Sequence, residues 1–102
     1  MTYGLLIGID ARTDMAGIVD YYNGQQQGLG SEFVTELHQT LQLITNQPKA
    51  FAIIHKRLGF RKKKTNRFPF DVFYKLKARQ KTVVIVAVIH ESRNPQIWKK
   101  RE

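Results

Sequence analysis

Cysteine is absent from the sequence, which excludes a disulfide-bonded scaffold, a thiolate nucleophile and a zinc or iron–sulfur site with cysteine ligands. Long apolar runs are also absent. The longest, residues 83–89, is far shorter than the about 20 residues that a membrane-spanning helix needs. No basic stretch precedes the apolar segment near the N-terminus, so a signal peptide is not expected. These absences predict a cytoplasmic protein that makes no contact with a membrane.

The chain has 102 residues, the length of one small domain, and we expect a single domain over residues 1–102. A chain of this length buries roughly two-thirds of the surface that its unfolded form exposes, so it needs no metal ion to fold. Its three histidines, His38, His55 and His90, do not have the spacing of metal ligands. We therefore expect neither a metal nor a cofactor.

Acidic residues are scarce in the second half of the chain, and the charge is strongly uneven. Residues 1–48 contain one base and five acids, a net charge of −4, whereas residues 49–102 contain sixteen bases and three acids, a net charge of +13. This asymmetry predicts an electropositive surface built mainly by the second half, and a polyanionic or acidic partner. The alternative is a solvated basic face that only keeps the protein soluble.

A short strand and two amphipathic helices are predicted in the first half. Residues 3–9 are apolar and partly β-branched, as in a buried strand. Apolar residues then recur at every third or fourth position over 11–22, with Asp10 as a candidate N-cap. The second helix has Ser31 as a candidate cap and ends before Pro48. Its apolar face contains Phe33, Leu37, Leu41 and Ile44.

The second half has the periodicity of strands. Residues 68–76 alternate between apolar and polar, and residues 82–90 are so rich in β-branched residues that a central strand covered on both faces is expected. Residues 52–55 and 58–61 are weaker strand candidates, and residues 61–67 are predicted to be a charged turn. The order β-α-α-β-β-β, with three or four strands after the helices, predicts an α+β fold with two N-terminal helices on a mostly antiparallel sheet.

His90 is the first residue that could carry chemistry, because it ends the most buried strand and Arg93 follows three residues later. A histidine beside cations can transfer protons in phosphodiester chemistry. The alternative is a partly buried histidine that hydrogen-bonds the turn after the strand. If residues 68–76 pair antiparallel with residues 82–90, residue 68 lies near residue 90, and Arg67 is expected beside His90.

A basic cluster follows Phe60 and ends at Phe68. Its cations, with aromatic residues at both borders, suit phosphate backbones and stacked bases. The alternative is a strand edge that lysines protect from aggregation. The cluster consists of Arg61, Lys62, Lys63, Lys64 and Arg67.

Asp71 lies on the opposite face of its strand from Phe70, so we expect it to be exposed or paired with a neighbouring base.

Taken in order, several short motifs resemble the RelE/ParE superfamily of bacterial type II toxin–antitoxin toxins over essentially the whole chain. The resemblance implies a compact toxin with a twisted antiparallel sheet on a helical pair, and a small cognate antitoxin that wraps over its surface. The motifs are Asp20-Tyr21-Tyr22, Gly28-Leu29-Gly30-Ser31-Glu32-Phe33, Arg67-Phe68-Pro69-Phe70 with Tyr74, and Val86-Ala87-Val88-Ile89-His90 with Arg93-Asn94-Pro95 and Trp98.

The resemblance leaves two activities open. ParE-like members resemble inhibitors of DNA gyrase, and RelE-like members resemble ribosome-dependent endoribonucleases that cleave mRNA. The ribonucleases often carry a functional tyrosine near the C-terminus, whereas no tyrosine follows Tyr74 here, so we favour a ParE-like toxin. A third reading is a non-toxic, basic nucleic-acid-binding module. Whether the chain is an enzyme therefore depends on which branch it follows.

The site residues differ between these readings. For a RelE-like enzyme the catalytic candidates are His90, Arg93, Arg61 and Arg67. For contact with the target or with nucleic acid, the candidates are Lys62, Lys63, Lys64, Arg67 and Arg93. On either reading we expect His90 and the arginines to share one electropositive surface.

Overall fold

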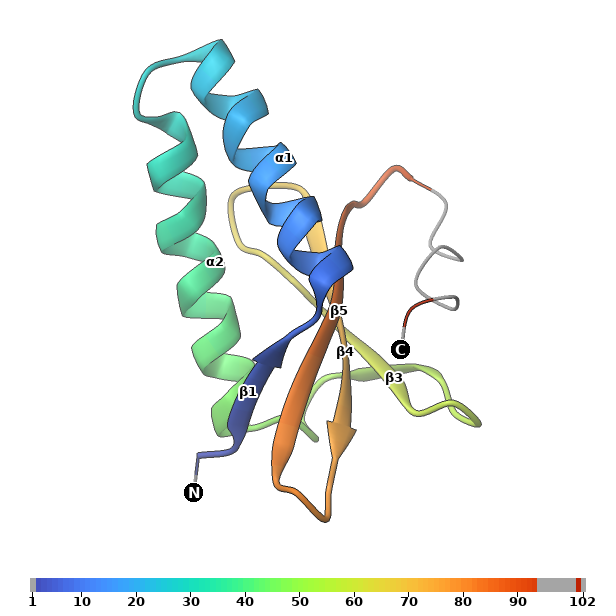
Figure 1. Ribbon diagram of the computed structural model, residues 1–102. Coiled ribbons are helices and arrows are strands. Elements are labelled where there is room, and N and C mark those ends of the chain that lie inside the picture. Colours follow the sequence, from blue (N-terminus) through green and yellow to red (C-terminus); the bar gives the residue numbers. More distant parts are fainter. Residues whose placement is uncertain (1, 94–100, 102) are drawn as a thin grey trace.

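The structure is a computed structural model that describes residues 2–93 and 101 (Figure 1). Two helices lie side by side and cover one face of a sheet. Within the described residues, no helix is long and apolar enough to cross a membrane. The elements in chain order are β1 (Gly4–Ile7), α1 (Ile9–Gln25), α2 (Leu29–Asn46), β2 (Ala52–His55), β3 (Phe60–Lys64), β4 (Phe70–Lys77) and β5 (Thr82–His90).

The five strands form one sheet in the order β1-β5-β4-β3-β2. β1 pairs parallel with β5, and the other pairs are antiparallel. The predicted α+β fold is therefore confirmed, and the weak candidate over residues 52–55 adds a fourth strand after the helices. β4 and β5 form the expected hairpin that contains Tyr74 and Val86, with a register shift at Phe73/Tyr74.

Glycines start both helices, which corrects the predicted caps. Gly8 donates its N–H to the Ile85 carbonyl and is also the N-cap of α1, so Asp10 lies in the first turn instead. Gly28 is the N-cap of α2 with a φ of 87°, a left-handed conformation that glycine adopts without strain. This turn lets α2 begin two residues before Ser31. A Cβ on Gly30 would lie 2.6 Å from the Asn23 amide oxygen, so the two helices approach closely here.

The core lies on both faces of β5, as the β-branched run predicts. On the helix side, the predicted α2 residues Phe33, Leu37, Leu41 and Ile44 pack with Tyr74 and neighbouring strand residues. On the far side, Phe60 and Phe73 pack with Val84, Val86 and Ile89. Burial on both faces holds β5 at the centre of the fold, so its last residue, His90, has a fixed position at the sheet's end.

The predicted charged turn over residues 61–67 is wrong in its first half, because Phe60–Lys64 is a strand. Lys62 lies opposite Phe73 and Lys64 opposite Asp71 across β3 and β4, and the two lysine side chains are about half exposed, at 42% and 54%. The turn itself starts at Thr65, whose buried hydroxyl donates to the Phe68 carbonyl. Phe68 and Pro69 belong to this turn, and β4 begins at Phe70.

Candidate functional site

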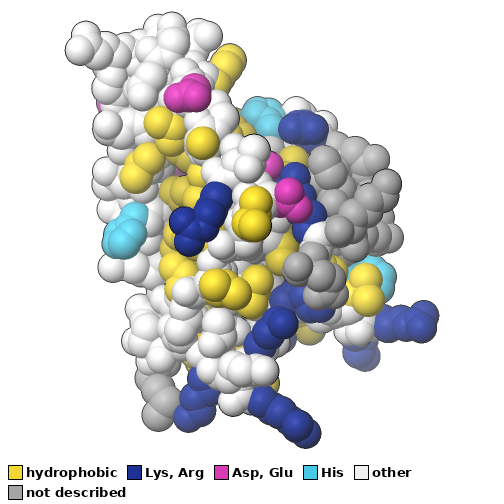
Figure 2. All heavy atoms as spheres, in the orientation of Figure 1, with side chains coloured by type: hydrophobic (Ala, Val, Ile, Leu, Met, Phe, Trp, Pro, Cys, Tyr) yellow, Lys and Arg dark blue, Asp and Glu magenta, His cyan; other side chains and the backbone are white. Residues whose placement is uncertain are grey.

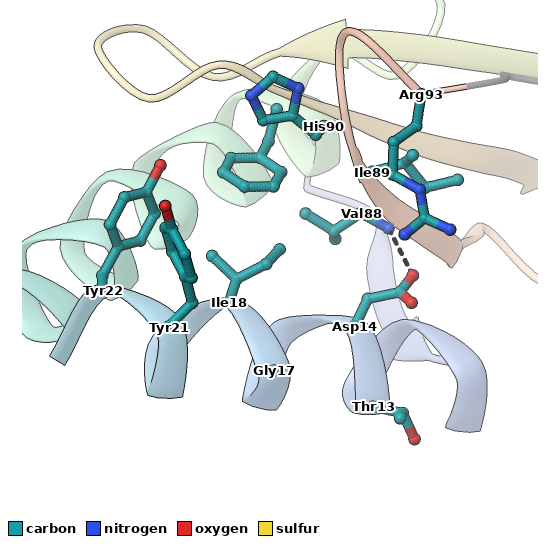
Figure 3. A pocket seen from close by; sticks show the side chains of 11 residues that line it. Thr13, Asp14, Gly17, Ile18, Tyr21, Tyr22, Val88, Ile89, His90 and Arg93 are labelled. Atoms are coloured by element: carbon teal, nitrogen blue, oxygen red, sulfur yellow. Dashed lines mark hydrogen bonds between the residues drawn. The ribbon is translucent and has the colours of Figure 1, made fainter. Parts of the chain in front are cut away.

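A hollow of about 490 Å³ lies between α1 and the end of β5 (Figure 3). It contains His90 and Arg93, the two site candidates from the C-terminal region that the structure describes. Side chains from one face of α1 form its opposite wall. The lining residues are Thr13, Asp14, Gly17, Ile18, Tyr21, Tyr22, Phe70, Val88, Ile89, His90 and Arg93.

His90 is held by the turn that follows β5. Its Nδ1 accepts a hydrogen bond from the Ser92 N–H at 3.1 Å and lies 2.8 Å from the Ser92 hydroxyl oxygen. A ring nitrogen that accepts an N–H carries no proton, so the neutral ring has its proton on Nε2. The His90 ring stands edge-on to the Phe70 ring, with the ring centroids 5.3 Å apart. The two residues lie opposite each other in the pairing of β4 with β5. The hydrogen bond to the following turn is therefore confirmed, and Nε2 is the nitrogen left for a ligand.

Arg93 enters the hollow from the same turn. Its backbone N–H donates to the His90 carbonyl at 3.0 Å, which fixes the start of the side chain. Figure 3 shows this side chain directed toward Asp14 on α1. Arg93 is exposed, and within the described chain no carboxylate lies within ion-pair distance of it. Arg93 is thus the cation of the hollow that can bind an anionic or polar group.

Asp14 has a structural role that the sequence pattern does not predict. β1 ends opposite Ile85, so the next residues of β5 have no strand on that side, and the Asp14 carboxylate accepts the Val88 N–H at 3.0 Å. The guanidinium of Arg101 binds the same carboxylate at 2.5 Å and donates to the Val86 carbonyl at 3.3 Å. Both side chains are mostly buried. Asp14 therefore stabilises β5 below the site and is already paired.

Two tyrosines on α1 complete the hollow. Tyr21 is 61% exposed and packs edge-on against Tyr22, with ring centroids 5.4 Å apart. Tyr22 packs against Phe68 at 4.9 Å. Burial, followed by the charges of Tyr21 and Glu36, raises the pKa of Tyr22 above its usual value. The adjacent tyrosines belong to the motif Asp20-Tyr21-Tyr22, which is the signal that could have placed them at the site.

Arg61 lies away from this hollow. Its guanidinium donates to the carbonyl oxygens of Lys49 and Phe51, at 3.2 and 2.8 Å, and thereby holds the segment that leads into β2. Arg61 pairs with Tyr74 in the sheet, whereas His90 pairs with Phe70. Tyr74 and Phe70 are four residues apart on β4, so the positions of Arg61 and His90 are separated by about 13 Å along the strand, at roughly 3.3 Å per residue.

Arg67 is bound to α2 instead of facing His90. Its guanidinium lies 2.6 Å from the Glu32 carboxylate and 4.6 Å from the centroid of the Phe68 ring. Its backbone N–H and that of Phe68 donate to the Glu36 carboxylate at 2.8 and 2.9 Å. The pairing of β4 with β5 does bring Pro69 to Glu91, but the Arg67 side chain lines a separate hollow with Glu32 and Glu36. The structure thus brings together His90 and Arg93, without Arg61 or Arg67.

The three lysines of β3 are divided between the two faces of the sheet. Lys62 pairs with the buried carboxylate of Asp71 at 3.7 Å, and Lys64 pairs with Glu91 at 3.0 Å. Lys63 extends over the Phe51 ring. Of the two expectations for Asp71, pairing with a base is confirmed and solvent exposure is wrong, because Asp71 is only 9% exposed. Carboxylates therefore neutralise much of this cluster.

No group of three His, Asp or Glu side chains within residues 2–93 and 101 is placed to hold a metal ion. The motif residues Asn94, Pro95 and Trp98 lie outside the described residues.

Comparison with known proteins gives the family. The family described as "ParE toxin of type II toxin-antitoxin system, parDE" matches residues 9–95, which include both helices and all of the sheet except β1. The chain belongs to this family. This ParE-family chain is thus the toxin component of a type II toxin–antitoxin system, as the motif resemblance implied. No curated protein matches the sequence.

Solved structures share the fold at low sequence identity. The chromosomal ParDE system of P. aeruginosa has a TM-score of 0.74 and 16% identity, over 87% of this chain and 96% of that chain. A double arginine-to-alanine mutant of E. coli RelE in the free state has a TM-score of 0.71 and 16% identity, over 97% of this chain and 93% of that chain. The toxin–antitoxin complex RelBE2 of Mycobacterium tuberculosis has a TM-score of 0.62 and 17% identity, over 88% and 99%. Because both ParDE and RelE structures match, the fold does not choose between the two activities.

Proposed function

We propose that this toxin stops growth by binding DNA gyrase, and that the hollow with Arg93 is part of the contact surface. The observation that supports binding over RNA cleavage is the separation of the four catalytic candidates. Arg61 is occupied by two backbone carbonyls and Arg67 by Glu32, so neither can stabilise charge on a phosphate held at His90. A ribonuclease needs such cations beside its proton-transfer groups.

The alternative, a RelE-like ribosome-dependent ribonuclease, has one observation in its favour. The free Nε2 of His90, the Arg93 guanidinium and the exposed Tyr21 ring line the same hollow. A histidine, a cation and a stacking surface could hold a nucleotide. The hydroxyl of Tyr74 is unsuited to this chemistry, because it is buried and donates to the Pro48 carbonyl at 2.6 Å.

The expected regulatory partner is a cognate antitoxin, which the family description and the ParDE and RelBE2 neighbours support. The +13 charge of residues 49–102 favours an antitoxin segment with more acids than bases. Apolar anchors would supply most of the affinity, and charge would mainly speed association. Raising the salt concentration is therefore expected to slow association far more than it speeds dissociation, and an unchanged association rate would contradict this.

A pair of assays on the purified chain tests the target. The chain is added to gyrase in a DNA supercoiling assay and, in parallel, to translating ribosomes with an mRNA whose cleavage is followed. We expect loss of supercoiling with intact mRNA. Arg93→Ala should weaken inhibition, whereas Arg12→Ala, which removes an exposed arginine from α1, should not. Cleaved mRNA with normal supercoiling would establish the ribonuclease alternative, and failure to arrest growth on induced expression would favour the non-toxic module.

A further inference from the structure

Two hairpin turns protrude at the end of the sheet opposite His90. The β2–β3 loop contains residues 56–59, and the β4–β5 turn contains residues 78–81. Phe60 pairs with Lys75, and Lys77 pairs with Thr82, so both turns lie at the same end of the sheet. Figure 1 shows them at the lower end of the molecule, away from the end of β5. Four strand ends spaced about 4.8 Å apart give this edge a width of about 14 Å.

Exposed cations occupy both turns and the strand ends beside them. Figure 2 shows Lys and Arg side chains along the lower and right-hand rim of the molecule. We call this set the tip surface. It consists of Lys56, Arg57, Lys77, Arg79 and Lys81, all of them exposed.

Four cations of the tip surface differ from Lys62 and Lys64 of β3 in having no carboxylate partner within the described residues. The sequence contains no Asp or Glu between Glu36 and Asp71, or between Asp71 and Glu91. Asp71 pairs with Lys64 in the sheet, at the far end of β3 from the tips. In the described part of the chain, no carboxylate lies within ion-pair distance of Lys56, Arg57, Lys77 or Arg79. Mutual repulsion among these cations therefore persists until an anion binds.

We propose that the tip surface binds the phosphate backbone of duplex DNA. Duplex DNA carries one charge per about 1.7 Å of axis, counting both strands, so a stretch of duplex as long as this edge, about 14 Å, carries roughly eight phosphates, of which those on the near side can meet the cations. A single strand would need aromatic side chains on which bases stack. Tyr21, the exposed tyrosine on α1, lines the hollow at the other end of the sheet. Of the aromatic residues near the tips in the described chain, Phe60 is buried and Tyr3 is partly buried against the core. This contact goes beyond the proposed gyrase binding, because it requires only DNA.

Fluorescence anisotropy of a labelled DNA duplex, titrated with the full chain over a salt series, tests the proposal. Arg57→Gln/Arg79→Gln should raise the Kd by about tenfold or more and make the slope of log K against log salt shallower by about 0.9 per lost contact. The matched control, Arg12→Gln/Lys49→Gln, removes the same charge from exposed positions outside the tip surface. It should change the Kd far less. Lys56→Gln/Lys77→Gln provides a second tip variant, and thermal melting checks that every variant is folded.

Several results would overturn the proposal. Equal losses in the tip and control variants would mean that only the net charge matters. Tighter binding to a single strand with the same number of phosphates would contradict recognition of a duplex. Binding of polyglutamate as tightly as the duplex would assign the surface to an acidic protein. None of these outcomes depends on gyrase, so the proposal of a DNA contact and the proposal of gyrase as the target can be rejected independently.

Discussion

The two ends of the sheet contain basic residues in different surroundings. At the end where β5 finishes, Lys64 pairs with Glu91, and Arg67 pairs with Glu32 on α2. At the opposite end, four cations of the tip surface, Lys56, Arg57, Lys77 and Arg79, have no carboxylate within ion-pair distance in the described chain. The difference teaches that a dense run of lysines in the sequence need not give the most electropositive surface, because the fold decides which cations meet carboxylates.

The acids of the first half of the chain explain this difference. Glu32 and Glu36 lie in the first half of α2, and Asp14 lies in the first half of α1. Their partners are Arg67, the backbone N–H groups beside it, and Arg101. The helices thus carry negative charge to the His90 end of the sheet.

The largest expected effect of breaking these pairs is at Asp14. Asp14→Ala leaves the Val88 N–H without its acceptor and the mostly buried Arg101 guanidinium without its partner. We expect a loss of about 3 kcal/mol in the free energy of unfolding. Urea denaturation measures it, with Asp20→Ala on the exposed face of α1 as the control. Equal stability of the two variants would contradict the structural role of Asp14.

A smaller loss is expected at Glu36. Glu36→Ala removes the acceptor of two backbone N–H groups in the β3–β4 turn, and we expect it to cost about 2 kcal/mol. Glu32→Ala removes only an exposed ion pair with Arg67 and should cost less than about 1 kcal/mol. Thermal and urea melts of the two variants compare the costs. A greater loss from Glu32→Ala would reverse this account of the turn.

Tyr74 predicts a pH dependence. Burial raises the pKa of Tyr74 from 10.0 to about 12, and Arg61 partly opposes this. The folded state favours the neutral phenol of Tyr74. This preference therefore contributes fully to the free energy of unfolding below pH 10, and the contribution is lost as the pH rises toward 12. Tyr74→Phe should cost about 1 kcal/mol at neutral pH by leaving the Pro48 carbonyl without its donor. It should also make alkaline unfolding less steep, and an unchanged alkaline profile would contradict this assignment.

The smallest effect is expected at Lys64. Lys64→Gln breaks a solvent-exposed pair with Glu91 and should change the free energy of unfolding by less than about 0.5 kcal/mol. Chemical denaturation of this variant is compared with that of Lys77→Gln, which breaks no ion pair among the described residues. A loss above 1 kcal/mol from Lys64→Gln would mean that the pair contributes more than exposed pairs do.

The sequence predicted the elements well, because periodicity records which faces are buried. The α2 stripe from Phe33 to Ile44 and the central strand over residues 82–90 are both where the patterns placed them. The helix starts were missed because Gly8 and Gly28 begin the helices through backbone geometry and make no side-chain cap.

The site was harder to predict than the fold. His90 and Arg93 lie three residues apart and share one hollow, so local sequence sufficed for them. Pairing of the other cations depends on contacts that are distant in sequence. Lys64 and Glu91 are 27 residues apart, Arg67 and Glu32 are 35 apart, and Arg101 and Asp14 are 87 apart. No local pattern encodes these pairs, and they decide which cations remain for a ligand.

The most direct test of a toxin that acts by binding is the effect of His90→Gln on growth arrest. Glutamine can accept the Ser92 N–H as Nδ1 does now, but it cannot transfer a proton near neutral pH. His38→Gln, on the exposed face of α2, is the matched control. With both variants expressed at the parent level, we predict that His90→Gln still arrests growth and inhibits supercoiling within about threefold of His38→Gln, whereas a loss of about 100-fold or more, typical of a removed general acid or base, would contradict the account.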